Sequence, residues 1–124
     1  MKKILLIEDD PDQVELYSAK FQMEGLDIIT AGDGRLGLAL AAKDRPDLIL
    51  LDIVMDDMDG LEVLRRLKQD KKTANIPVVL LTNLIKKNLI KESRELGAVG
   101  FWSKTEIMPQ QIVDRIRKIL KIKK

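Results

Sequence analysis

The chain has 124 residues, which fits one compact domain with a sizeable apolar core. Charged residues make up 34% of the sequence, above the usual quarter, and the net charge is +2. That small net charge conceals a division, because residues 1–62 carry 6 basic and 15 acidic side chains, whereas residues 63–124 carry 16 and 5. The division predicts either two charged faces or an acidic pocket opposite a basic surface.

The absence of cysteine and histidine excludes several kinds of chemistry. Without cysteine there is no disulfide, thiolate nucleophile or cysteine-bound metal, which is compatible with a reducing cytosol. Without histidine, Ser-His-Asp catalysis, histidine-bound zinc and a phosphohistidine relay within the chain are excluded. Any bound metal is then a hard cation held by oxygen atoms, such as Mg²⁺. Because no segment approaches the roughly 20 apolar residues of a membrane span, we expect a cytoplasmic protein.

Five short runs of branched apolar residues alternate with segments of helical periodicity. The runs are Ile4–Ile7, Ile28–Thr30, Leu48–Leu51, Val78–Leu81 and Val99–Trp102. The first and third are continuously apolar, which is typical of parallel strands buried on both faces. Five strand–helix units with short connections predict a doubly wound α/β domain.

Capping residues and glycines predict the limits of the helices. Asp10 is interpreted as an N-cap rather than a metal ligand, with Pro11 at the first helical position and Gln13 as its capping-box partner. Gly25 and Gly97 each follow a helical segment in the position of a C-terminal stop.

Polar residues follow four of the predicted strands, at the edge where an α/β sheet carries its functional site. They are Glu8, Asp9, Asp10, Asp52, Thr82, Ser103 and Lys104. Gathered carboxylates repel one another unless they take up a proton or bind a cation, and a divalent oxygen-bound ion would relieve the repulsion. The sequence has no GxxxxGK[ST] phosphate-binding loop, and we expect no bound nucleotide. A carboxylate beside Mg²⁺, with a lysine and a threonine to hold an anion, suits an aspartate that accepts a phosphoryl group.

Five motifs together resemble the receiver domain of two-component response regulators. They are Ile7–Asp10, Pro46–Asp52, Met58–Gly60, Ile76–Thr82 and Gly100–Lys104. They occur in order and with fitting spacing over essentially the whole chain. The resemblance implies a flavodoxin-like (βα)5 fold with a parallel five-stranded sheet of order 2-1-3-4-5. It also implies a single receiver domain over residues 1–124 without an output domain, as in stand-alone chemotaxis regulators.

The resemblance assigns roles to the residues of the expected pocket. Asp52 would accept the phosphoryl group. Mg²⁺ would bind Asp9, Asp52 and the backbone carbonyl of Val54, with Glu8 acting through a water molecule. Lys104 would pair with Asp52 at rest and with a phosphoryl oxygen afterwards.

A switch and a signalling surface also follow from the resemblance. Thr82 would move to the phosphoryl group, and Phe101 would turn inward into the space that it leaves. The signal would pass through the surface of helix 4, strand 5 and helix 5. Ile90 falls about 140° from Ile85 at 100° per residue, so with Lys91 and Arg94 it is a possible partner surface. The alternative is a single exposed apolar residue without a function, which is normal on protein surfaces. The core stripe of helix 4 is predicted to consist of Ile85, Leu89 and Leu96.

The implied partners are a histidine kinase or phosphotransfer protein and a downstream protein target, without direct contact to nucleic acid or membrane. The chain would be a monomer or a phosphorylation-dependent dimer. It would be a signalling domain rather than an enzyme, apart from catalysing its own phosphorylation and dephosphorylation.

Three other functions are alternatives to phosphorylation signalling. A scaffold or adapter would keep the fold without phosphorylation. A phosphate-ester hydrolase would need a second acid two residues after Asp52, where this chain has Val54. The basic segment of residues 115–124 suggests nucleic-acid contact, but an aromatic content of 3% offers no stacking platform.

Three features depart from the usual receiver pattern. The family usually has a cis Lys-Pro bond at the last motif, whereas this chain has Lys104-Thr105, so the bond is either trans or strained. Asp56 stands where proline is common and is expected to join Asp57 and Asp59 near the pocket mouth. Bulkier residues than usual follow Thr82, namely Asn83 and Leu84.

Overall fold

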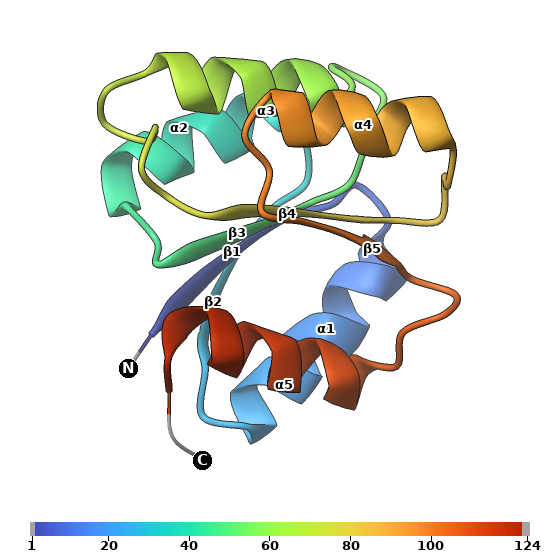
Figure 1. The fold of residues 1–124 in the computed structure, drawn as a ribbon. Coiled ribbons are helices and arrows are strands. Elements are labelled where there is room, and N and C mark those ends of the chain that lie inside the picture. Colours follow the sequence, from blue (N-terminus) through green and yellow to red (C-terminus); the bar gives the residue numbers. More distant parts are fainter. Residues whose placement is uncertain (1, 123–124) are drawn as a thin grey trace.

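The structure is a computed structural model that describes residues 2–122 (Figure 1). Its strands are β1 (Lys3–Ile7), β2 (Asp27–Ala31), β3 (Leu48–Leu51), β4 (Val78–Thr82) and β5 (Gly100–Ser103). Its helices are α1 (Pro11–Met23), α2 (Gly34–Asp44), α3 (Gly60–Gln69), α4 (Lys87–Glu95) and α5 (Pro109–Leu120). All strand pairs are parallel, and the order β2-β1-β3-β4-β5 confirms the predicted sheet. The end of the basic segment, Lys123 and Lys124, lies outside the described residues.

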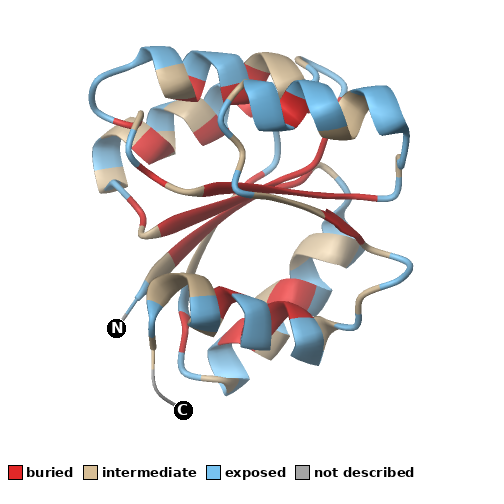
Figure 2. Cartoon of the chain, in the orientation of Figure 1, coloured by how far each residue is buried: buried red, intermediate tan, exposed pale blue. Residues whose placement is uncertain are grey.

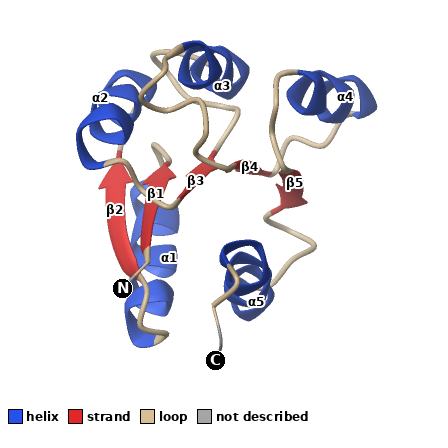
Figure 3. Cartoon of the chain, turned by 60° about the vertical axis from the view of Figure 1, so that its left-hand side comes forward, coloured by secondary structure: helices blue, strands red, loops and turns tan. Residues whose placement is uncertain are grey.

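Helices cover both faces of the sheet, as Figure 3 shows: α1 and α5 lie on one face, and α2, α3 and α4 lie on the other. Successive side chains of a strand point to opposite faces, so each central strand supplies two cores. In β1, Leu5 and Ile7 join the core under α2 and α3, whereas Ile4 and Leu6 join the core under α1 and α5. All four are at most 1% exposed, which explains why this run is continuously apolar (Figure 2).

The edge strands differ by a residue or two from their apolar runs. β2 is extended to Asp27 and Ala31, and β5 begins at Gly100 rather than Val99, whose side chain is 57% exposed. Backbone pairing rather than side-chain burial sets these limits, so the apolar pattern marks them only approximately. Among the described helices, none has the length and apolar character needed to cross a membrane.

Asp10 caps the start of α1 as predicted, but the predicted capping box with Gln13 does not form. The Asp10 carboxylate accepts a hydrogen bond from the Asp12 N–H at 3.0 Å. The Asp10 N–H donates to the Glu8 carboxylate at 3.1 Å instead of to Gln13. A buried acceptor next to the helix start therefore replaces the expected partner. Gly25 follows α1 with a φ of 79°, in the left-handed C-terminal position that was predicted.

The predicted core stripe of α4 is partly wrong. Ile85 lies before the helix and is 43% exposed. Leu89 and Leu96 pack against the core, as expected, and between them Ser93 is 1% exposed. The sequence pattern missed Ser93 because a polar residue does not count in an apolar stripe, whereas its hydroxyl can donate to a carbonyl of the preceding turn.

The start of α3 packs directly on the backbone that follows β3. The Gly60 N–H donates to the Ile53 carbonyl at 2.7 Å. A Cβ at Gly60 would lie 2.2 Å from the Asp52 carbonyl oxygen and 2.6 Å from the Ile53 Cα. Only glycine fits here, because the neighbouring atoms belong to backbone that cannot turn aside.

We predict that Gly60→Ala lowers the free energy of unfolding by about 1–3 kcal/mol, because the added methyl group must displace the backbone at Asp52. Urea denaturation measures this change. Gly32→Ala is the control, since a Cβ there meets no atom within 4 Å. Equal stability of the two variants would contradict the prediction.

Candidate functional site

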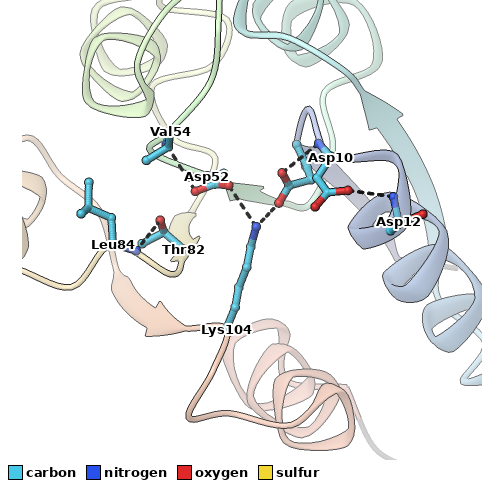
Figure 4. Close-up of polar contacts among 8 residues, drawn as sticks. Asp10, Asp12, Asp52, Val54, Thr82, Leu84 and Lys104 are labelled. Carbon is cyan, nitrogen blue, oxygen red and sulfur yellow. Dashed lines mark hydrogen bonds and ion pairs between the residues drawn. The ribbon is translucent and has the colours of Figure 1, made fainter.

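A pocket of about 400 Å³ lies at the carboxyl ends of β1, β3, β4 and β5. It brings together most of the polar residues that were predicted to meet there (Figure 4). The residues that line it are Glu8, Asp9, Asp10, Gln13, Asp52, Val54, Thr82, Asn83, Leu84 and Lys104. Gln13 was missed as a pocket residue, because the pattern around Asp10 predicted a capping role that Gln13 does not have.

Three carboxylates form the acidic centre of the pocket. Glu8, Asp9 and Asp52 each offer an oxygen atom within 4.8 Å of the others. Glu8 is 1% exposed and Asp52 is 7% exposed, so both carboxylates have lost most of their water. Their backbones are fixed by the sheet, since the Glu8 N–H donates to Ala31 and the Asp52 N–H donates to Ile7. Repulsion between the carboxylates is therefore built into the fold rather than relieved by movement.

Lys104 is the cation that faces these carboxylates. Its ammonium donates to the Asp52 Oδ2 at 2.9 Å and also to the Glu8 Oε1 (Figure 4). Its side chain is 6% exposed. Burial by itself would lower the pKa of Lys104, but hydrogen bonds and charges from the two carboxylates raise that pKa above its ordinary value. Lys104 therefore stays charged, and one positive charge faces three acids.

The Glu8 carboxylate lies in an unfavourable electrostatic environment. Burial raises the pKa of Glu8 above its ordinary value, and the negative charge of Asp52 acts in the same direction. The hydrogen bond and charge of Lys104 lower the pKa only in part. Hard oxygen donors with uncompensated negative charge are the ligands that a divalent cation such as Mg²⁺ prefers, so the residues present fit such an ion.

The loop after β4 forms another side of the pocket. The Thr82 hydroxyl oxygen accepts a hydrogen bond from the Leu84 N–H at 3.1 Å, and Thr82 is 1% exposed. On the loop after β3, the Val54 N–H lies 3.4 Å from the Asp52 Oδ1, and the Val54 side chain is exposed (Figure 4). Thr82 and Val54 thus both reach the pocket in which Asp52 lies.

Phe101 is not part of this pocket. It is half-buried and packs against the core under α4, where it lines a separate hollow of about 80 Å³ with Ile90 and Arg94. Lys91 and Arg94 are exposed on α4, whereas Ile90 is half-buried.

The carboxylates of Asp57 and Asp59 do not line the pocket, contrary to the prediction. Asp57 accepts hydrogen bonds from the N–H groups of Gly34 at 2.9 Å and Arg35 at 3.1 Å, at the start of α2. The hydrogen bond from Gly34, above all, lowers the pKa of Asp57. Asp59 caps α3 by accepting from the Glu62 N–H at 3.0 Å. Helix starts attract carboxylates, and these two acids stabilise the helices beside the pocket.

Asp56 is also absent from the residues that line the pocket, so the expected additional carboxylate at its mouth is not there. It is exposed on the loop after β3.

The Lys104–Thr105 bond is trans, because the described residues contain no cis peptide bond. This resolves the alternative that the sequence left open. The loop after β5 is held instead by hydrogen bonds, including one of 2.9 Å between the hydroxyl groups of Ser103 and Thr105.

Comparison with known proteins places this architecture among signalling domains. Residues 4–117 match the family described as the response regulator receiver domain. The chain is 40% identical over 121 residues to the response regulator PleD of Caulobacter vibrioides, covering 98% of this chain and 26% of PleD. It is 35% identical over 122 residues to the sporulation initiation phosphotransferase F of Bacillus subtilis, covering 98% of this chain and 96% of that protein. The chain thus spans about a quarter of one relative and nearly all of the other.

Solved structures show the same fold. The chemotaxis protein CheY4 of Vibrio cholerae superposes with a TM-score of 0.89 at 28% identity, covering 96% of this chain and 98% of that one. A Mn²⁺-bound form of the response regulator Rcp1 superposes with a TM-score of 0.82 at 28% identity, covering 95% and 93%.

The raised pKa of Glu8 predicts a pH-dependent stability that Glu8→Gln removes. Between the ordinary pKa of 4.5 and the raised value, the folded protein retains a proton that the unfolded chain has lost. The contribution of Glu8 to stability therefore falls as the pH rises through this window. Unfolding free energies are measured in the presence of a chelator, which removes divalent cations. The free energy of unfolding of Glu8→Gln should rise relative to that of the wild type as the pH rises.

Glu15→Gln is the control, because Glu15 is exposed on α1. Its difference from the wild type is the reference against which the Glu8→Gln trend is compared. No trend for Glu8→Gln beyond this reference would show that Glu8 does not retain its proton.

Proposed function

This chain belongs to the family of response regulator receiver domains, and on that premise we propose that Asp52 accepts a phosphoryl group from a histidine kinase or a phosphotransfer protein. The observation that supports this most directly is the position of Asp52. Its carboxylate is buried beside Glu8 and Asp9 and bound by the ammonium of Lys104, at the carboxyl end of a central strand. Since this chain contains no histidine, the phosphohistidine belongs to the partner.

In the proposed transfer, a carboxylate oxygen of Asp52 forms a bond to phosphorus while the bond from phosphorus to the donor's ring nitrogen breaks. The electron pair stays on that nitrogen, which takes up a proton from solvent. Such transfers depend mainly on positioning and on neutralising charge. Lys104 supplies a positive charge for a phosphoryl oxygen. The Thr82 hydroxyl accepts from the Leu84 N–H and has its own hydrogen to donate to a phosphoryl oxygen.

We propose Mg²⁺ as the cofactor. Asp9, Asp52 and the backbone carbonyl of Val54 would hold it directly, and Glu8 would hold it through a water molecule. When bound, the ion neutralises charge on the oxygens of the phosphoryl group. The three clustered carboxylates with one lysine support this assignment.

The output of the domain is proposed to pass through α4, β5 and α5. Thr82 and Phe101 would change position together, and Ile90, Lys91 and Arg94 would contact the downstream protein. The hollow between α4 and β5, which Phe101 and Ile90 line, supports this proposal, because it leaves space beside the aromatic ring. The downstream protein, the cytoplasmic location and the oligomeric state belong to the same proposal.

Asp52→Asn should abolish phosphorylation, because an amide oxygen is a far weaker nucleophile than a carboxylate. The intact protein is incubated with Mg²⁺ and acetyl phosphate and weighed by mass spectrometry, and the wild type should gain one phosphoryl group. The control is Asp56→Asn, an exposed acid on the same loop, which should behave as the wild type. No uptake by the wild type, from acetyl phosphate or from a kinase partner, would favour the scaffold instead.

Asp9→Asn should weaken Mg²⁺ binding at least about tenfold, because it removes a charged ligand from the centre of the cluster. The fluorescence of Trp102, the one tryptophan of the chain, offers a titration signal. Asp12→Asn, on the exposed first turn of α1, is the matched control. Unchanged Mg²⁺ affinity in Asp9→Asn would place the ion elsewhere.

A further inference from the structure

The ammonium of Lys104 has to reach two carboxylates at the far side of the pocket. A lysine side chain has four flexible carbon–carbon bonds, so the position of its ammonium depends on how firmly its backbone is held. Lys104 lies in a turn between β5 and α5, immediately after the last residue of the strand. What holds this turn therefore bears on the chemistry of the site.

Backbone hydrogen bonds hold the turn at two points. The Lys104 N–H donates to the Thr82 carbonyl at 3.0 Å, which links the lysine to the end of β4. The Ser103 carbonyl accepts from the Ile107 N–H at 3.0 Å, which closes the turn. Neither bond fixes the chain directly after Lys104.

A side-chain hydrogen bond spans that position. The hydroxyl groups of Ser103 and Thr105, which flank Lys104 in the chain, lie 2.9 Å apart. Ser103 is 6% exposed and paired in the sheet opposite Thr82, so it is a rigid anchor. Thr105 is exposed, so its hydroxyl could bind water, yet it turns back to Ser103. The bond closes a small ring of atoms around the Lys104 backbone.

We propose that the hydroxyl pair of Ser103 and Thr105 is a positioning element that holds Lys104 for the phosphoryl group. The role of holding Lys104 for the phosphoryl group rests on the proposed function, whereas the local restraint of the Lys104 backbone does not. Thr105 is not among the residues that line the pocket, whereas its chain neighbour Lys104 is, so we expect its effect to reach the site through Lys104. The Thr105 hydroxyl, and not merely the residue's size, is then what matters.

The test is a set of variants of the full chain. Thr105→Val removes the hydroxyl and keeps the size, whereas Thr105→Ser keeps the hydroxyl. Each is made in the wild type and in Lys104→Met, and the dissociation constant of beryllofluoride, a phosphoryl analogue, is measured with Mg²⁺ by Trp102 fluorescence. We expect Thr105→Val to weaken binding about three- to tenfold, the effect of one lost hydrogen bond, and Thr105→Ser to retain it.

The double variant separates positioning from general stability. If the hydroxyl pair acts through Lys104, Thr105→Val has no further effect once Lys104 is replaced by methionine. An equal loss in both backgrounds, or no loss in the wild type, would overturn the proposal.

A second measurement needs no ligand. Hydrogen exchange of the Lys104 amide, followed by NMR, should be about tenfold faster in Thr105→Val, while the amide of Val79 in β4 keeps its rate. Unchanged exchange at Lys104 overturns the proposal. If the wild type binds no beryllofluoride, the proposed function fails. If Lys104→Met does not fold or does not bind beryllofluoride, the double-variant comparison cannot be measured. In both cases the exchange rate of the Lys104 amide by itself tests the positioning role of the hydroxyl pair.

Discussion

The ion pairs that Lys104 makes with Glu8 and Asp52 are the interaction on which the rest of the site depends. Charges taken out of water are costly unless they are paired, and here one buried ammonium faces three carboxylates. One ammonium cannot balance all of these carboxylates, and the sheet holds the backbones of both buried acids, Glu8 and Asp52, in place. The negative charge that remains makes the pocket suitable for a cation, because a cation reduces the repulsion. A phosphoryl group carries negative charge of its own, so its entry depends on Lys104 and on such a cation to balance that charge.

Rigid support for this unfavourable arrangement comes from the two apolar cores. Leu50 and Leu51, just before Asp52, are fully buried on opposite faces of the sheet. A movement of Asp52 away from its neighbours would therefore expose apolar surface on both sides. Gly60 adds a steric restraint, since α3 begins in contact with the Asp52 carbonyl. The proposed phosphoacceptor therefore lies in one of the most firmly held parts of the backbone.

The division of charge along the sequence has two structural causes. Part of the acidic half forms the pocket, but Asp57 and Asp59 serve as acceptors at helix starts. Basic residues of the second half are exposed on α3, α4 and α5, for example Arg65, Lys91 and Lys118, whereas Lys104 lines the pocket. Aspartate side chains thus have different roles in this fold, depending on whether they lie beside backbone N–H groups or beside other carboxylates.

The sequence by itself determined the alternation of strands and helices, the burial of the central strands on both faces, and the group of Glu8, Asp9, Asp52, Thr82 and Lys104. It could do so because periodicity reports burial, and because the ends of parallel strands meet at one edge of the sheet. The order of the strands followed from the resemblance to the receiver family. The motifs then named the family, which the comparisons show.

Only the tertiary structure decided which partner each polar group takes. The Asp10 N–H donates to Glu8 rather than to Gln13, and the Asp57 carboxylate accepts from N–H groups at the start of α2. The partner is a near neighbour in the chain in the first case and lies 23 residues away in the second, and both choices depend on where the fold places the loops around the pocket. Ile85 lies before the first residue of α4. The trans Lys104–Thr105 bond and the hydroxyl pair beside it were likewise decided in space, because they depend on how β5 is held against β4.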